Sequence, residues 1–282
     1  MSRNNDERLG APIPSAPPPP PTREPSDDLF SFVAPTDFID LPSEGQYYPP
    51  DSPLYGKKTL EIKHMTAKEE DILTSESLLR KGIAIDRLLK SLLVDKSVNL
   101  DDLLVGDKNA LIVGARITGY GSHYETNVNC PSCTTNQPVK FDLNELKIRR
   151  LVVPEGVRRS ESNTYFVTLP KSRLEVELRL MTGALEKAYT ESTERKRKQK
   201  LPSSIVTDLL RMLIVSVNGR DDVATLNKLL EVLPVQDSSY IKSVYEGISP
   251  DIDMSHEFTC LACSHEGRVA VPLTANFFWP KR

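Results

Sequence analysis

Apolar residues recur at helical spacing through the first half of the chain. The segment Thr66-Ala67-Lys68-Glu69 has the pattern of a capping box, in which the threonine hydroxyl and the glutamate carboxylate satisfy free backbone N–H groups. It predicts a helix that begins here and runs to about Leu79. Two further amphipathic helices are predicted over residues 85–93 and from about 107 to 117. The residues expected to end the second of these are Gly119 and Gly121.

The second half of the chain combines strands and helices without βαβ order. Alternating apolar residues predict strands over residues 164–169 and 174–181. Thr182 is the predicted N-cap of a long polar helix that ends in the basic run 195–200. The remaining predicted helices cover residues 204–217, 226–233 and 238–245, with Asp237 as the N-cap of the last.

The same alternation flanks two Cys-x-x-Cys turns, so each turn is predicted to lie at the tip of a β-hairpin. These turns contain the four cysteines of the chain: Cys130, Cys133, Cys260 and Cys263. A Zn²⁺ ion takes four thiolates tetrahedrally, and a Cys-x-x-Cys turn presents two sulfurs to one metal. We predict that the two hairpins form a split zinc ribbon around one structural Zn²⁺. Four thiolates fill its coordination shell, which leaves no position for a substrate.

The separation of the two turns is unusual, because residues 134–259 lie between them. Loop-closure entropy grows only logarithmically with length, and a structural zinc contributes ~10 kcal/mol or more of apparent binding energy. A redox role for the turns is the weaker interpretation, because neither turn opens a helix after a strand. The possible substitute ligands, which we expect to be ordinary surface residues, are His123, His256 and His265.

The N-terminal residues 1–36 are rich in proline, including the run Pro17–Pro21. Such a segment favours polyproline II geometry and buries too little apolar surface to offset its ordering entropy. We expect a disordered tail that serves either as a solubilising leader or as a docking peptide for an aromatic groove on a partner.

The predicted fold class is α+β, with helical hairpins and short antiparallel ribbons that include the split Cys₄ zinc ribbon. In this scheme the metal joins the middle of the chain to its C-terminal part. The expected parts are the disordered tail (1–36), a helical region with the first hairpin (37–143), a mixed strand and helix insertion (144–250), and the second hairpin with an aromatic C-terminus (251–282).

Composition excludes several classes of function. The 36 basic and 39 acidic residues give a net charge of −3, which argues against bulk electrostatic coating of nucleic acid. No apolar run approaches the ~18 residues of a membrane span, and the N-terminus lacks a secretory signal, so we expect a soluble cytosolic protein. The sequence contains no phosphate-binding glycine loop and no hydrolase or kinase signature, which predicts a non-enzymatic scaffold.

A zinc-ribbon nucleic-acid-binding or transcription regulatory protein is the main alternative. The basic run 195–200 could contact phosphates, but acidic residues precede it on the same helix, as the helix dipole favours without any ligand. Most residues near the cysteines are neutral or acidic, which disfavours this alternative. A hydrolase with an unrecognised site is a further alternative, for which the sequence nominates no residues. The aromatic end, 277–280, is expected to pack on the protein's own core or to dock into a partner.

Several stretches resemble members of a known family. They are residues 41–45 (LPSEG), 65–73 (MTAKEEDIL), 106–110 (GDKNA), the run from Tyr120 to Cys133, and the late stretches around 237–238, Pro250, 260–263 and 277–280. On these residues the chain resembles the T4-type bacteriophage baseplate proteins, the hub subunit and hub assembly group of contractile-tailed phages.

The resemblance implies a non-enzymatic baseplate hub subunit or hub assembly factor, whose partners are other phage baseplate and hub proteins. It implies a location in the host cytoplasm during assembly, or in the tail baseplate of the virion, and leaves open which applies. The only residues that it carries over are the four cysteines, as a metal site, and it implies no catalytic residues.

Overall fold

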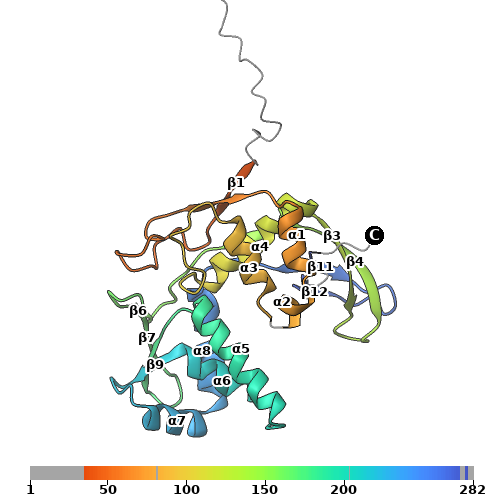
Figure 1. Ribbon diagram of the computed structural model, residues 1–282. Coiled ribbons are helices and arrows are strands. Elements are labelled where there is room, and N and C mark those ends of the chain that lie inside the picture. Colours follow the sequence, from red (N-terminus) through yellow and green to blue (C-terminus); the bar gives the residue numbers. More distant parts are fainter. Residues whose placement is uncertain (1–34, 81, 203, 274–276, 279–282) are drawn as a thin grey trace, which may run out of the picture. The chain divides into compact units, whose positions relative to one another are not determined.

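The computed structural model describes residues 35–80, 82–202, 204–273 and 277–278 (Figure 1). The predicted tail therefore lies outside the described residues, except for its last two positions, and Thr36 already begins a strand. None of the described helices is long and apolar enough to cross a membrane. The elements of the N-terminal part are β1 (Thr36–Asp40), β2 (Thr59–Lys63), α1 (Ala67–Thr74), α2 (Glu76–Arg80), α3 (Ala84–Leu92) and α4 (Val105–Tyr120).

The predicted capping box opens α1. The Glu69 carboxylate accepts a hydrogen bond from the backbone N–H of Thr66 (3.1 Å) and another from the Ser91 hydroxyl (2.7 Å), which ties α1 to α3. The prediction of one helix to Leu79 is wrong, because α1 ends at Thr74 and α2 begins at Glu76. The Thr74 hydroxyl bonds back to the carbonyl of Glu70, and the next residue, Ser75, adopts an extended backbone that interrupts the helix.

Helix α4 is the central element, since it packs against β1, α3, α5 and β10 (Figure 1). It begins at Val105 and continues through Gly119, one of the two glycines predicted to end it. The other, Gly121, is confirmed as the residue that ends it, with φ of +79°. Gly106 allows a close approach to the backbone of another segment, because a Cβ there would lie 1.9 Å from the carbonyl oxygen of Pro250. The start of α4 is thereby fixed against the end of the predicted insertion.

The predicted insertion contains a sheet of four antiparallel strands in the order β6-β7-β8-β9. The two ends of the inserted segment lie side by side, because β5 (Lys147–Arg149) near its start pairs antiparallel with β10 (Asp251–Asp253) directly after it. The remaining elements of this region are β6 (Arg158–Arg159), β7 (Tyr165–Thr168), β8 (Glu175–Leu178), α5 (Gly183–Lys198), α6 (Ile205–Leu213), β9 (Ile214–Val217), α7 (Val223–Val232) and α8 (Val235–Ile248).

The predicted helix over residues 204–217 is wrong in its last four residues. The helix α6 ends at Leu213, and Ile214–Val217 form the strand β9, which pairs with β8. Three of these four residues are β-branched and fit a pleated sheet well. The Ser216 hydroxyl also donates to the Glu177 carboxylate across the pair (2.7 Å), a long-range contact that local periodicity does not reveal.

The prediction that Asp237 caps the last helix is also wrong. Helix α8 begins at Val235, with Pro234 as its N-cap, so Asp237 lies inside the first turn. Its buried carboxylate accepts hydrogen bonds from the backbone N–H groups of Lys171 (2.8 Å) and Ser172 (2.9 Å) in the turn between β7 and β8. The residue therefore caps a distant turn and not its own helix.

The C-terminal aromatic residues pack on the protein's own core. Phe277 and Phe278 are buried, and the Phe277 ring meets the Tyr124 ring edge to face at 5.1 Å. The Arg116 guanidinium of α4, which is also fully buried, donates to the backbone carbonyls of Phe277 (2.7 Å) and His123 (2.9 Å). The last predicted members of this aromatic end, residues 279–280, lie outside the described residues.

The Asp237 carboxylate provides a test of the packing between α8 and the sheet. Asp237→Ala leaves two partly buried N–H groups without acceptors, so we expect the free energy of unfolding to fall by about 2 kcal/mol. Urea denaturation at pH 7 measures this change. The matched control is Asp221→Ala, at an exposed position before α7, which should change it by less than about 0.5 kcal/mol. Equal stability of both variants would contradict the assigned role.

The same carboxylate predicts a pH dependence. Burial raises the pKa of Asp237, but hydrogen bonds from the Lys171 and Ser172 N–H groups outweigh this and hold the pKa below its usual 3.8. Such a group stabilises the fold above its unfolded-state pKa, and this contribution is lost as the pH falls through the native pKa. The stability difference between wild type and Asp237→Ala should therefore be complete at pH 7 and shrink below about pH 3.8. A difference that persists unchanged in stronger acid would contradict this assignment.

Candidate metal centre

The two predicted cysteine hairpins are present. The first joins β3 (His123–Asn129) to β4 (Asn136–Asp142), and the second joins β11 (Ser255–Thr259) to β12 (Glu266–Ala270). Each forms an antiparallel sheet of two strands. The Cys-x-x-Cys segments lie in the connecting turns, as the alternation on both sides indicates.

The two turns have the same backbone geometry. In the first, the Cys130 N–H donates to the Thr135 carbonyl and the Thr134 N–H donates to the Cys130 carbonyl, each at 2.9 Å. In the second, Cys260, His265 and Ser264 make the equivalent bonds, also at 2.9 Å. Thr134 and Ser264 share the left-handed conformation, with φ of 59° and 55°. Two distant sequences thus build the same sulfur-presenting turn.

The turns bring all four sulfurs together. They lie within 4.8 Å of one another, with 3.8 Å between the sulfurs of Cys130 and Cys263 and 3.6 Å between those of Cys133 and Cys260. A tetrahedral ion with Zn–S bonds of ~2.3 Å separates its ligand sulfurs by about 3.8 Å. A disulfide needs ~2.05 Å, and all four cysteines are free. The donor set therefore fits one tetrahedral metal ion.

The surroundings shift the pKa values of two of the sulfurs in opposite directions. Hydrogen bonding with the side chain and backbone of Thr135 lowers the pKa of Cys133 to about 6. The backbone N–H of His265 lowers the pKa of Cys263, but the hydrogen bond to Cys133 and the other neighbouring sulfurs raise it, to about 12. One thiolate forms readily here, and its charge then keeps the proton on a neighbour. A bound cation removes this conflict, because it compensates the charge of several thiolates at once.

One comparison with known proteins identifies a family. The family model described as T4 bacteriophage base plate protein matches residues 38–279, which is most of the chain. The chain belongs to this family. No curated protein and no solved structure matches it. The family match confirms the resemblance to T4-type baseplate proteins and makes the chain a phage baseplate protein.

Gln137 joins the two hairpins of the baseplate protein. From β4, its buried side chain donates to the Thr259 carbonyl (3.1 Å) and accepts from the Leu261 N–H (2.9 Å), on either side of Cys260. These two bonds hold the second cysteine turn against the first hairpin without any metal. Gln137 is not among the site residues predicted from the sequence, although it occupies the same strand face as Val139 and Phe141, where a polar side chain is an exception to the apolar alternation.

The histidines near the cysteines lie outside the group of four sulfurs. His123 is exposed, and the half-buried His256 meets the Phe141 ring edge to face at 5.2 Å, a second contact between the hairpins. His265 contributes its backbone carbonyl to the second turn.

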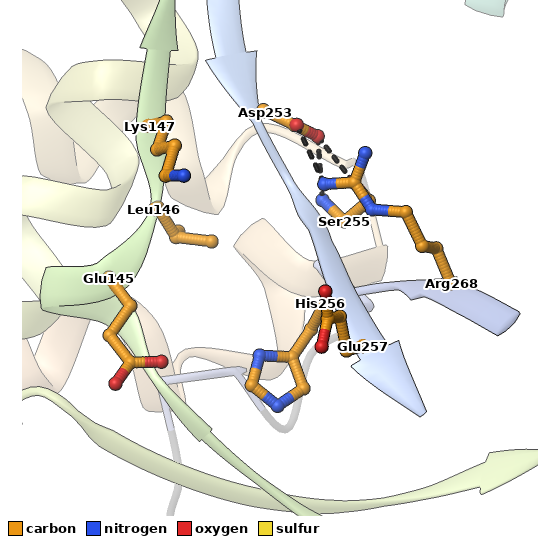
Figure 2. A pocket seen from close by; sticks show the side chains of 8 residues that line it. All are labelled: Glu145, Leu146, Lys147, Asp253, Ser255, His256, Glu257 and Arg268. Carbon is orange, nitrogen blue, oxygen red and sulfur yellow. Dashed lines mark hydrogen bonds and ion pairs between the residues drawn. The ribbon is translucent and has the colours of Figure 1, made fainter. Parts of the chain in front are cut away.

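A polar pocket of about 210 Å³ lies beside the second hairpin (Figure 2). Figure 2 shows Arg268 and Ser255 both bonded to the Asp253 carboxylate, with the His256 ring and the Glu145 carboxylate on the other side of the pocket. The Ser255 hydroxyl donates to Asp253 (2.5 Å) and not to the adjacent His256. Among the described residues this pocket thus provides no serine–histidine pair with the geometry of an activated nucleophile.

The geometry of the four sulfurs predicts metal binding. Protein purified under reducing conditions should hold one equivalent of zinc, and the Co²⁺-substituted form should show the absorption of a tetrahedral thiolate site. Metal analysis checks the stoichiometry. Cys260→Ser should lower the zinc content to well below half an equivalent, while the control Ser132→Ala, at an exposed position within the first turn, should retain all of it. Zinc-free wild-type protein would contradict the assignment.

The Gln137 contacts predict a second effect. Gln137→Ala removes both bonds that position the second turn, so we expect metal affinity to fall by about 10–100-fold while stoichiometry stays at one. Competition with a chromophoric chelator measures the affinity. The matched control is Asn136→Ala, because the Asn136 amide is exposed and bonds to Asn129 within its own hairpin. Equal affinities of the two variants would show that Gln137 does not position the site.

Proposed function

We propose that this baseplate protein is a non-enzymatic component of the baseplate hub, either a hub subunit or a hub assembly factor, stabilised by one structural Zn²⁺. The observation that carries the proposal is the convergence of four cysteine sulfurs in a chain that belongs to the baseplate family.

The chemistry of the donor set supports zinc. Thiolates are soft ligands, and a tetrahedral set of four is typical of structural zinc or of iron–sulfur sites. Cys130, Cys133, Cys260 and Cys263 would be the ligands, and the group would supply cohesion between the two hairpins. A complete set of four protein ligands leaves no coordination position for water or substrate, which favours a structural role.

The position of the site supports a scaffolding role. The ion would join two hairpins that flank the residues 144–250, and the β5–β10 pair holds the ends of the same segment together. The segment that contains α5 to α8 would thus be held at both of its ends, by the β5–β10 pair and by the ion between the hairpins. A rigid body of this kind suits protein–protein contacts, and the family implies that its partners are other phage baseplate proteins. Its location would be the host cytoplasm during assembly and the tail of the virion if it remains there.

An affinity-tagged copy expressed during infection tests the hub proposal. We expect purification from infected cells to recover baseplate intermediates together with the protein, and the Cys130→Ser/Cys260→Ser double variant to lose them. The control is Ser132→Ala, which keeps the ligand set. Recovery of nucleic acid at physiological salt, without baseplate proteins, would contradict the proposal and favour the nucleic-acid alternative.

Mass spectrometry of purified virions separates the two forms of the proposal. A subunit is found in the virions, whereas an assembly factor is required for their formation but absent from them. Baseplates that assemble normally without the protein would contradict both forms.

A further inference from the structure

A groove of about 530 Å³ lies between α7 and the turn that follows β9. Helix α7 packs beside β9 (Figure 1). The apolar side chains that line the groove are not fully covered: Val232 is 68% exposed and Leu174 is half-buried, whereas Val217 and Leu229 are buried. The groove therefore has an apolar lining that this chain leaves partly open to solvent.

One face of α7 forms a wall of this groove. The lining residues on the helix follow the i, i+3, i+4, i+7 spacing of a single helical face; they are Thr225, Lys228, Leu229 and Val232. A single exposed valine is ordinary on a protein surface. At the end of an apolar groove, however, Val232 extends the surface that a partner can contact, beyond what the fold itself uses.

The charged groups that line the groove are all cationic. They are the guanidinium of Arg220 and the ammonium of Lys228. Both side chains are exposed, and neither forms an ion pair with a described residue. Among the described residues, no aspartate or glutamate lines the groove. Its electrostatic character is therefore positive, which favours an anionic group on any ligand.

The carboxylates closest in sequence do not neutralise these cations. Asp222 caps α7 by accepting a hydrogen bond from the Thr225 N–H (2.9 Å). Hydrogen bonding with Thr225 is the main cause that holds the pKa of Asp222 below its usual value, and the charge of Arg220 contributes less. Asp221 and Glu231 are exposed but do not line the groove. The two cations thus remain available to a partner.

We propose that this groove binds a segment of another baseplate protein that carries apolar side chains flanked by carboxylates. The apolar lining takes up the apolar side chains, and Arg220 and Lys228 pair with the carboxylates. Complementary charges of this kind steer docking and fix the register of the bound segment. The volume lies within the ~300–1,000 Å³ of ligand sites, so the groove accepts a few side chains and not a whole domain. The inference rests on the proposed function for the class of partner, since a hub component contacts other baseplate proteins.

Nucleic acid fits this groove less well. Proteins hold single strands largely by stacking bases on aromatic side chains, and no aromatic residue lines the groove. Binding to duplexes depends on many phosphate contacts, whereas this groove offers two cations beside leucine and valine side chains. The lining therefore favours a protein segment.

Site-specific photo-crosslinking in infected cells tests the proposal. A tagged full-length copy carries p-benzoylphenylalanine in place of Val232, at the exposed end of the groove. We expect a crosslink to another baseplate protein, which mass spectrometry should locate in a segment with apolar residues and Asp or Glu. The matched control places the same group at Val223, which is 73% exposed on the same helix but about 2.5 turns away, and thus on the opposite face. The control position should not crosslink to that segment.

Charge reversal tests the role of the two cations. Combined with the crosslinker at position 232, Arg220→Glu/Lys228→Glu should lower the crosslinked fraction by about tenfold or more, because like charges would then face the carboxylates of the partner. The control Arg211→Glu/Lys242→Glu makes the same change of charge at two exposed positions on α6 and α8 that do not line the groove. It should leave the crosslinked fraction unchanged. Circular dichroism verifies that both variants are folded.

Every other outcome overturns the proposal. A crosslink from position 232 to a second copy of this chain, to nucleic acid or to a segment without carboxylates identifies a different occupant. The absence of a crosslink, equal crosslinking from position 223, or a crosslink that survives the charge reversal shows that the groove does not bind in this way. The tag separates this failure from that of the proposed function. Baseplate intermediates recovered without a crosslink from the groove leave the hub proposal intact, whereas recovery of neither contradicts both.

Discussion

Four sulfurs held within 4.8 Å of one another set the main constraint on this fold. Four thiolates at this separation repel one another strongly, so the deprotonated cluster favours a cation at its centre. Two-stranded hairpins are marginally stable on their own. Here each gains from the other through the Gln137 amide, the contact between Phe141 and His256, and the shared sulfur cluster. The ion is thus proposed to complete an interface that the protein already prepares.

Besides the contacts between the two cysteine hairpins, α4 also connects the middle of the chain to its C-terminal part. The buried Arg116 guanidinium donates to backbone carbonyls of His123, at the start of the first hairpin, and of Phe277, beyond the second. At the other end of α4, the Asp107 carboxylate is buried and accepts from the hydroxyl (2.6 Å) and N–H (3.0 Å) of Ser43. Charged groups buried in this way require their partners, because an unpaired buried charge is costly. Helix α4 therefore connects the N-terminal part of the chain, at Ser43, to the two segments that flank the cysteine hairpins, at His123 and Phe277.

The cysteine spacing and the surrounding alternation predicted both hairpins and all four residues of the sulfur cluster, because each signal is local and repeated. The capping box at Thr66 was equally predictable. What the sequence did not reveal depends on partners distant in the chain: the strand β9 forms because β8 lies beside it, and Asp237 is recruited by a turn more than 60 residues earlier. Gln137 is an intermediate case, since its polarity on an apolar strand face marked it as exceptional, but only the fold shows which backbone it holds.

The most direct test of the central claim is X-ray absorption at the zinc K-edge of the purified protein, which reports the ligand atoms and their distances. We expect four sulfur neighbours at about 2.3 Å and no nitrogen or oxygen atom bonded to the ion. A spectrum that requires an imidazole nitrogen or a water oxygen among the ligands would contradict it, because the site would then be open or built from other residues.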